Sequence, residues 1–293
     1  MRLVVAFPPG GGADNLVRAV APAAQKFLGQ PLVIDNRPGA GGSVGVESVA
    51  RSAPDGYTIT HGTNGTHGIN LFLYSRIAYD PIVDFAPVTR FTIVPAMLVI
   101  HPSLPASSVT ELLAYLKANP GKVSFSSSGN GTTSHMAAVM FMKLAGVEMV
   151  HIPYKGGGPA LAGILAGDVQ LNIDLMAVTF PNVKAGRLKG LAVTTAHRVA
   201  VAPDTPTLDE SGVKGFEIAA TDGIYAPAGT PRPIIDRLNA AFVQALNDPE
   251  VRERLLSRGS VPSPSTPEEL TRHIASELPK WRDLVRASGA KVD

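Results

Sequence analysis

The sequence predicts an α/β protein built from two modules. Strand-like apolar runs alternate with segments of helical period from Leu3–Phe7 to Tyr57–His61. A second series of the same kind extends from Val123–Ser126 to Gly190–Thr195. Strand and helix in strict alternation are typical of a parallel sheet covered by helices. A further extended run, Phe216–Ala226, then leads into C-terminal helices, so we expect the second module to be inserted into the first.

The expected boundaries follow from where the chain passes between the two series. One crossing is expected near Ile100–Pro102 and the other near Thr221–Tyr225. We therefore assign residues 1–100 together with 224–293 to the first module, and residues 101–223 to the second.

In the first module, the strand Leu3–Phe7 ends in a proline- and glycine-rich loop. Apolar residues then recur at helical period as far as Leu28, and Gly29 supplies a C-terminal stop. Pro22 lies within this helix and is expected to kink it. Leu32–Asn36 is the next predicted strand.

A second helix is expected from Ser43, as its N-cap, to Val49. Beyond the strand Tyr57–His61, residues Val88–Ile100 read as two extended segments separated near Pro95.

Helix starts in the remainder of the chain are marked by capping residues. Ser108 and Glu111 form a capping box before a helix that ends at Ala118. A helix over Thr133–Leu144 follows the strand Val123–Ser126. Three Ser/Thr/Asp-type caps precede the C-terminal helices: Thr230-Pro231, Asp248-Pro249 and Thr266-Pro267 with Glu269.

Composition excludes several classes of protein. With 45% hydrophobic and 17% charged residues, a packed core is expected and disorder is not. A net charge of +2 gives no electrostatic argument for nucleic acid or a membrane surface. No cysteine is present and the seven histidines lack zinc-site spacing, so we expect neither thiol chemistry nor a metal site. No apolar run reaches the roughly 18 residues of a spanning helix.

Polar and glycine-rich stretches follow one predicted strand after another. In open α/β sheets, ligands bind at the C-terminal ends of strands, near helix N-termini. We therefore expect a ligand cleft shared by the two modules. The stretches are Pro8–Asp14, Gly62–His67, Ser126–His135, Tyr154–Pro159 and Asp174.

The stretch Phe125–His135 (FSSSGNGTTSH) is a predicted strand-to-helix turn rich in hydroxyls and glycine. Free backbone amides and the positive end of a helix dipole make such a turn a seat for an anion. Phosphate is disfavoured, because Pro8–Asp14 lacks the P-loop lysine and Gly129-Asn130-Gly131 only nearly matches a dinucleotide motif. We expect no cofactor.

Catalysis is the other alternative. Gly41-Gly42-Ser43-Val44-Gly45 matches the nucleophile-elbow pattern, but Arg37–Ala40 separates this serine from its strand. Ser128, His135 and Asp174 could converge as a Ser/His hydrolase site, although such residues are common in polar clefts. We expect no enzyme and no catalytic residue.

Individual side chains also have structural interpretations. Asp14 is expected to cap its own helix rather than contact a ligand. For His135 and Tyr154, local packing and ligand contact both stay open. Asp174 ends an apolar strand, so it must be hydrated, bonded to a helix N-terminus or in contact with ligand.

Motifs along nearly the whole chain resemble one known family. They are, in order, PPGGGAD, VIDNRPGAGG, DGYT, NGT, DFAPVT, KANPGK, FSSSGNGTTSH, IPYKGGGPAL, APAGTP and LNAAF. The chain resembles the substrate-binding proteins of tripartite tricarboxylate transporters, also called Bug-type extracytoplasmic solute receptors. This resemblance implies a type II periplasmic-binding-protein fold of two α/β domains, with a ligand cleft between them and two crossover hinge segments.

The resemblance also implies a function. Such a receptor captures a small organic carboxylate by hinge closure, as a monomer in the periplasm, and hands it to two membrane subunits. The signal peptide would be absent from this chain because it has been removed, with Met1 in its place; from composition alone a cytosolic protein stays open. A ligand-sensing co-receptor for a sensor kinase is the alternative role.

Carried over by motif, the ligand-binding positions come from both modules. The family typically holds the carboxylate through backbone amides, hydroxyls and ordered waters. One departure is Asp222, where the family usually carries an aromatic residue; an acid there could repel a second carboxylate, accept from a ligand amine or hydroxyl, or be solvated. The positions are Pro9, Gly10, Gly11, Gly12, Ala13, Asp14, Thr63, Asn64, Thr66, Ser128, Gly129, Asn130, Thr132, Thr133, His135, Tyr154, Asp174 and Asp222.

Overall fold

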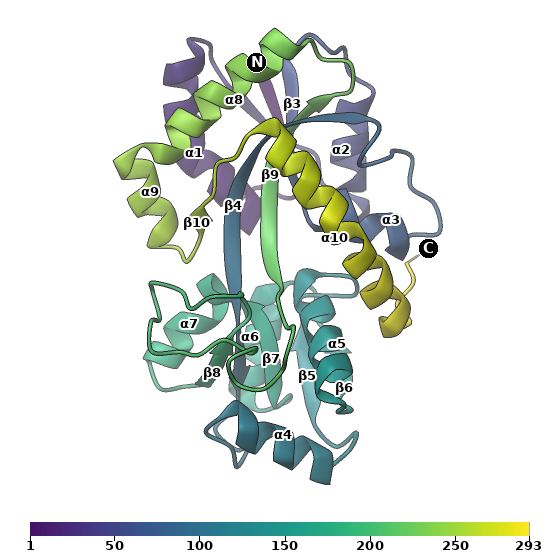
Figure 1. Ribbon diagram of the computed structural model, residues 1–293, viewed down its shortest axis with the longest axis vertical. Helices are drawn as coiled ribbons and strands as arrows, with labels where there is room; N and C mark the ends of the chain where they lie inside the picture. Colours follow the sequence, from purple (N-terminus) through teal and green to yellow (C-terminus); the bar gives the residue numbers. More distant parts are fainter. Residues whose placement is uncertain (293) are drawn as a thin grey trace. The chain divides into compact units, whose positions relative to one another are not determined.

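The computed structural model describes residues 1–292, and Asp293, at the end of the range expected for the first module, lies outside the described residues. The chain forms two compact units (Figure 1). Unit 1 comprises Met1–Ile93, Thr221–Asp283 and the C-terminal residues from Lys291; unit 2 comprises Val94–Ala220 and Leu284–Ala290. Both consist of a sheet covered by helices, which confirms the predicted α/β class.

The sheet of unit 1 has the strand order β2-β1-β3-β9-β4, with β10 beside β4. β1 pairs in parallel with β2 and β3, whereas β9 pairs antiparallel with β3, and β10 antiparallel with β4. The strands are β1 (Arg2–Val5), β2 (Val33–Asn36), β3 (Thr58–Thr63), β4 (Phe85–Ile100), β9 (Ala219–Pro227) and β10 (Val261–Pro262).

Helices cover both faces of this sheet. α1 packs beside α8 over an apolar core that includes Leu3, Ile59 and Phe242. A second apolar cluster, with Val46, Phe85 and Tyr225 among its members, fills the space beneath α2. The helices are α1 (Gly12–Leu28), α2 (Ser43–Ala50), α3 (Asn70–Leu73), α8 (Arg232–Asn247), α9 (Pro249–Leu256) and α10 (Pro267–Ser288), with short helical turns at Ala40–Gly42 and Gly65–Ile69.

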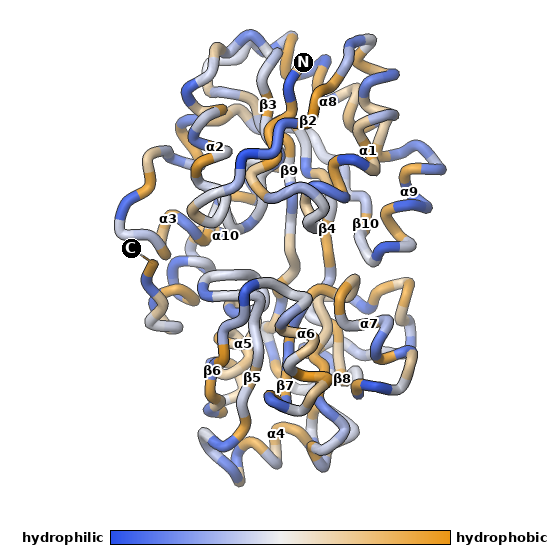
Figure 2. Tube along the Cα trace, turned by 180° about the vertical axis from the view of Figure 1, so that it is seen from behind, coloured by the Kyte–Doolittle hydropathy of each residue, from blue (hydrophilic) through white to orange (hydrophobic). Residues whose placement is uncertain are grey.

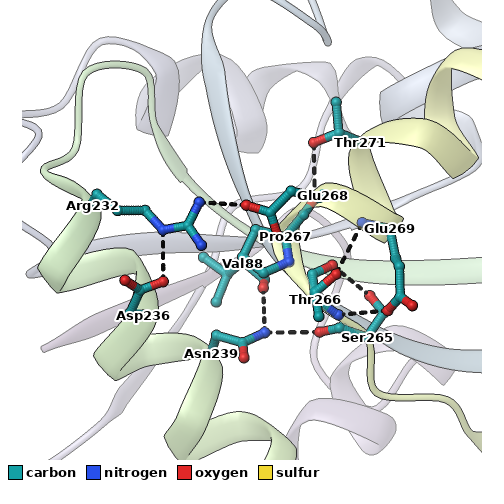
Figure 3. A network of polar contacts seen from close by, with 10 residues as sticks. All are labelled: Val88, Arg232, Asp236, Asn239, Ser265, Thr266, Pro267, Glu268, Glu269 and Thr271. Carbon is teal, nitrogen blue, oxygen red and sulfur yellow. Dashed lines mark hydrogen bonds and ion pairs between the residues drawn. The ribbon is translucent and has the colours of Figure 1, made fainter.

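Most predicted helix ends are confirmed. Thr266 and Glu269 cap α10 reciprocally: the Thr266 amide donates to Glu269 Oε2, and the Glu269 amide donates to Thr266 Oγ1 (Figure 3). Asp248 Oδ1 accepts from the amides of Glu250 and Val251 at the start of α9. Gly29 ends α1 in the left-handed conformation that favours glycine, with φ of 66°.

Three local predictions are wrong. Thr230 does not cap α8, because Pro231 takes the N-cap position without a side-chain hydrogen bond and the Thr230 hydroxyl donates to the Pro227 carbonyl at 2.7 Å. Ser43 is the first residue of α2 and not its N-cap, a position taken by Gly42 with a φ of 94°. The Ser43 hydroxyl instead accepts from Asn70 Nδ2 at 3.1 Å. Strand β4 is continuous through Pro95, because its pairing with β10 ends at Ile93 and its pairing with β7 begins at Ala96. Proline is tolerated in a strand where no ladder hydrogen bond needs its N–H.

The sheet of unit 2 has the strand order β4-β7-β5-β6, and β8 also pairs with β4. β5 is parallel to β6 and β7, while β4 is antiparallel to β7 and β8. Its other strands are β5 (Ser124–Ser127), β6 (Val150–Pro153), β7 (Leu171–Leu175) and β8 (Lys189–Val193).

Each helix of unit 2 but α4 directly follows a strand of its sheet. The helices are α4 (Val109–Ala118), α5 (Thr133–Ala145), α6 (Gly157–Ala166) and α7 (Met176–Lys184). α6 is largely apolar along its length, in contrast to the charged α9 of unit 1 (Figure 2). Its Ile164 lies in a core with Met97, Val99 and Val193. The strand-to-helix turns of unit 2 thereby place polar loops at the C-terminal ends of β5, β6 and β7.

Two further findings concern the described residues as a whole. Over residues 1–292, no helix combines the length and apolarity needed to cross a bilayer. Within the same range, His, Cys, Asp and Glu side chains form no group of three or more that could hold a metal ion.

Candidate functional site

The carboxylate of Asp14 is turned into the loop that precedes it. Asp14 Oδ2 accepts from the Gly10 amide and from Arg18 Nε, both at 2.8 Å. Oδ1 accepts from Asn36 Nδ2 at 2.9 Å. The hydrogen bond from Arg18, with those from Gly10 and Asn36, lowers the pKa of this carboxyl to about 2. Asp14 therefore folds the loop. It does not cap α1, contrary to the sequence-based expectation, because its carboxylate accepts from the Gly10 amide before the helix and from no amide of the first turn.

The N-terminus of α1 is left without a side-chain cap. Gly11 occupies the N-cap position and carries no side chain to bond the first turn. The first amides of a helix have no acceptor within the helix. Here they belong to Gly12, Ala13 and Asp14, and Gly12 is exposed. The loop thus presents backbone donors at the positive end of a 17-residue helix.

The turn after β3 is closed by its own threonines. The Thr63 amide donates to Thr66 Oγ1 at 2.9 Å, and the Thr66 carbonyl accepts from the hydroxyl of Tyr79 at 2.7 Å. Asn64 links this turn to β9, because its side-chain oxygen accepts from the Thr221 amide at 3.1 Å. Thr63, Asn64 and Thr66 therefore form one braced turn in unit 1.

Asp222 lies directly across from this turn. It is the register partner of Thr63 in the β3–β9 pair. Its Oδ2 accepts from Thr92 Oγ1 at 2.9 Å and lies 3.6 Å from Nε2 of His61. Neither ring nitrogen of His61 has a hydrogen-bond partner within the described residues, although the side chain is fully buried. Sequence reasoning missed His61 and Thr92; strand alternation, which places His61 on the same face as Thr63, could have indicated the first.

A second histidine is buried beside the turn. His67 stacks on Tyr225 with ring centroids 3.8 Å apart, and its Nδ1 lies 2.9 Å from Thr66 Oγ1. Burial, together with the nearby His61, lowers the pKa of His67 to about 3. The ring is therefore neutral at physiological pH.

In unit 2, Ser128 and Asp174 meet at the ends of β5 and β7. Ser128 Oγ donates to Asp174 Oδ2 at 2.7 Å, and the Leu175 amide donates to Oδ1 at 2.8 Å. Burial raises the pKa of Asp174, against the opposing effect of these two hydrogen bonds. Of the interpretations left open for Asp174, its contact with the start of α7 is the one that the structure displays.

The N-terminus of α5 is capped by Thr132. Its hydroxyl accepts from the His135 amide and donates to the Gly129 carbonyl at 2.7 Å. Gly129 has a φ of 127°, a conformation that only glycine adopts readily. Asn130 is exposed at the tip of this loop, and Thr133 begins the helix.

His135 is held by its own loop. Its Nδ1 accepts from the Gly131 amide at 3.1 Å, and its ring stacks on His151 with centroids 4.0 Å apart. Burial, with His151 nearby, lowers the pKa of His135 to about 4. His151, which sequence reasoning missed, lies 2.6 Å from Ser127 Oγ through its Nε2.

This arrangement is not that of a catalytic triad. The hydroxyl proton of Ser128 is directed at Asp174, whereas His135 Nδ1 is occupied by a backbone amide. In a Ser-His-Asp triad, the histidine base must accept from the hydroxyl of the serine nucleophile. What the polar groups can do is accept and donate hydrogen bonds around a small anion.

The predicted residues thus fall into two sets, one in each unit. Pro9–Asp14, Thr63–Thr66 and Asp222 belong to unit 1, whereas Ser128–His135, Tyr154 and Asp174 belong to unit 2. The Tyr154 ring packs on α6, where a Cβ at Gly163 would lie 2.3 Å from its hydroxyl. Its backbone amide donates to the Ser127 carbonyl, which ties the loops after β5 and β6 together.

Comparison with known proteins identifies the family. Residues 16–290 match the model of the tripartite tricarboxylate transporter family receptor. The solved structure of R. palustris Rpa4515 with adipate is 36% identical, covers 99% of this chain and 98% of that chain, and has a TM-score of 0.87. Periplasmic binding protein BugD is 35% identical; it covers 99% of this chain and 97% of that chain, with a TM-score of 0.83. MatC from Rhodopseudomonas palustris with bound malate is 34% identical, with coverage of 97% and 98% and a TM-score of 0.82.

These likenesses extend over nearly the full length of each chain, and the fold is that of the two-domain periplasmic solute-binding proteins. The family and its solved members are substrate-binding receptors and not enzymes, as the sequence predicted. The chain belongs to the receptor family of the tripartite tricarboxylate transporters.

Proposed function

We propose that this chain captures a small organic carboxylate by closure of its two units and delivers it to the membrane subunits of a tripartite tricarboxylate-type transporter. The observation that carries the proposal is the start of α1. There an exposed glycine loop ends in a helix without a side-chain cap, while the only acid of the loop is turned inward. Backbone amides at a helix N-terminus bind carboxylates by hydrogen bonds and by the helix dipole.

Neutral donors suit reversible capture. A buried lysine or arginine in the ligand-free receptor would be costly to desolvate. Amides and hydroxyls avoid this cost, because solvent satisfies them until a ligand arrives. Arg18, the nearest arginine in the chain to the α1 loop, already donates to Asp14 and does not supply a free cation.

Unit 2 offers a matching set of donors. The loop Ser128–His135 carries hydroxyls and glycine amides ahead of α5, and Ser128 and Asp174 are joined beside it. The residues proposed to contact the ligand, directly or through water, are those carried over from the family pattern. They are Pro9–Asp14, Thr63, Asn64, Thr66, Ser128–Asn130, Thr132, Thr133, His135, Tyr154, Asp174 and Asp222.

Related proteins support the ligand class. Two of the solved relatives contain adipate and malate, both small carboxylates. BugD is described as a periplasmic binding protein, and the family model is that of a transporter receptor. We propose on this basis that the chain acts as a monomer in the periplasm, with the two membrane subunits as its partners.

The test is a thermal-shift screen of the purified protein against mono-, di- and aromatic carboxylates, with amines and sugars as controls. A ligand that binds only the native state raises the melting temperature by mass action. Isothermal titration of each hit should give one site per chain, and mass spectrometry should recover the ligand unchanged. A rise with amines or sugars and none with any carboxylate would exclude the proposed ligand class.

A further inference from the structure

We infer that the ligand carries an ammonium group beside its carboxylate and that Asp222 is its acceptor. This inference rests on the proposed function and narrows its ligand class to amino acids. It concerns residues of unit 1 alone: Asp222 in β9, Thr92 in β4 and His61 in β3.

The first argument is the uncompensated charge of Asp222. The side chain is only 7% exposed, yet within the described residues no lysine or arginine lies within 4.0 Å of it. Its polar neighbours are the hydroxyl of Thr92 and the imidazole of His61. A buried carboxylate without a fixed cation is costly in the empty protein. A ligand ammonium would supply the missing positive charge and up to three donors.

The second argument is the state of His61. Both ring nitrogens are buried without a hydrogen-bond partner among the described residues, and Nε2 lies 3.6 Å from Asp222 Oδ2. This distance is too long for a hydrogen bond. The polar groups of these two side chains are therefore incompletely hydrogen-bonded within unit 1, and a ligand group that donates to Asp222 would meet an acceptor there.

The third argument is the position of Asp222 next to the turn proposed to hold the ligand carboxylate. Asp222 is the register partner of Thr63, the first residue of the braced turn proposed to hold the ligand carboxylate. The two functional groups of an α-amino acid are separated by a single carbon. An ammonium beside the carboxylate would thus reach the neighbouring strand, whereas a second carboxylate there would be repelled by Asp222.

The experiment compares matched pairs of ligands that differ only in the amino group: glycine and acetate, aspartate and succinate, glutamate and glutarate, phenylalanine and 3-phenylpropanoate. Binding is measured by isothermal titration to the full chain. In every pair with measurable binding, the amino compound should bind about 10-fold tighter or more, the ratio expected of one charge-assisted hydrogen bond.

The Asp222→Asn variant should abolish this preference while keeping the Thr92 hydrogen bond, since the amide oxygen still accepts. The readout is the affinity ratio within each pair, which should fall from about 10 to about 1 in the variant, as expected for the loss of one charge-assisted hydrogen bond. Asp55→Asn, an exposed acid of unit 1, is the matched control and should change nothing.

Three outcomes are informative. A preference for amino compounds that is lost in Asp222→Asn supports the inference. Carboxylate binding without that preference, or with a preference that survives in Asp222→Asn, overturns the inference and leaves the proposed function intact. If no carboxylate of either kind binds, both are wrong. A melting curve of each variant establishes that it is folded, and Asp222→Glu, which keeps the charge, should retain part of the preference if the acid itself is the acceptor.

Discussion

Ser128 donates its hydroxyl proton to Asp174 Oδ2 over 2.7 Å, while the backbone of Leu175 satisfies the other carboxylate oxygen. Among residues 1–292, Asp174 has no ion-pair partner, so hydrogen bonds stabilise its buried carboxylate. The pair fixes the ends of β5 and β7 against one another within unit 2. The contribution of this pair to stability can be tested by replacing Ser128 and Asp174 in turn.

Ser128→Ala should lower the free energy of unfolding by about 1–3 kcal/mol, because Asp174 loses a donor that water does not replace in a buried position. Asp174→Asn should instead raise it at neutral pH, since the buried charge is removed while the amide oxygen still accepts from the Leu175 amide and the amide nitrogen can donate to the Ser128 hydroxyl oxygen. Burial raises the pKa of Asp174, so wild type loses stability as pH rises above the ordinary value of 3.8, and the advantage of the variant should grow over the same range. Urea unfolding at pH 4 and pH 7 measures both effects; an Asn variant less stable than wild type at pH 7 would contradict this account.

Gly12→Pro should weaken carboxylate binding about 10-fold, because it removes one amide from the start of α1 at a cost typical of a charge-assisted hydrogen bond. Proline is tolerated at the first position of a helix, and Gly11 before it is extended, with φ of −71° and ψ of 170°. Gly12→Ala keeps the amide and meets no atom within 4 Å, so it is the matched control. Titration of both variants with the best carboxylate gives the comparison. Equal affinities would place the ligand away from this amide.

Asp14→Ala should destabilise the protein. The Gly10 amide and Asn36 lose an acceptor, which predicts a loss of about 1–3 kcal/mol in the free energy of unfolding. Loss of the ion pair with Arg18 contributes little to this value, because the Arg18 side chain is half-exposed. Asp283→Ala, which breaks an exposed pair with Arg282, is the control and should cost less than about 1 kcal/mol. The Asp14 contribution is present above pH 3.8 and is lost as pH falls toward its native pKa of about 2. Denaturation of both variants at pH 7 provides the test.

Lowering the pH should reduce the free energy of unfolding, because buried His67 resists protonation in the native state. Its native pKa is about 3, so below pH 6.5 the unfolded chain takes up a proton that the native state refuses. Each pH unit between these two values should remove about 1.4 kcal/mol per such histidine. The stability is present in full above pH 6.5. His67→Phe keeps an aromatic ring on Tyr225 and should reduce the slope of unfolding free energy against pH by about one proton between pH 6 and pH 4; an unchanged slope would rule out His67 as the titrating group.

Much of the fold follows from local signals in the sequence. Alternation of apolar runs predicted the α/β class, and the caps at Asp248 and at Thr266 with Glu269 are where capping patterns placed them. Such features depend on residues close in the chain. The errors at Ser43 and Pro95 have the opposite origin, since a partner distant in sequence decides each: Asn70 for the serine, and the spacing of β10 and β7 along β4 for the proline.

The candidate site was predictable as a set of loops and not as a set of contacts. Strand ends mark the loops in the sequence, and the family pattern names the residues. The position of Asp222 beside His61 depends on strand register between segments 161 positions apart. No periodicity in a single sequence encodes such pairings.

Strand β6, at the outer end of the unit 2 sheet, offers few backbone donors to an incoming strand. The amides of Val150 and Tyr154 point inward to β5, so those of the intervening odd-numbered positions, His151 and Pro153, face outward. Proline has no N–H, which leaves His151 as the single amide donor that the edge of β6 offers to an incoming strand. Apolar side chains are exposed on this strand at Val150 and Ile152, and a complete donor row there would invite a second copy to add its own strand. One imino acid at position 153 thus removes a backbone donor from the edge at which these apolar side chains are exposed.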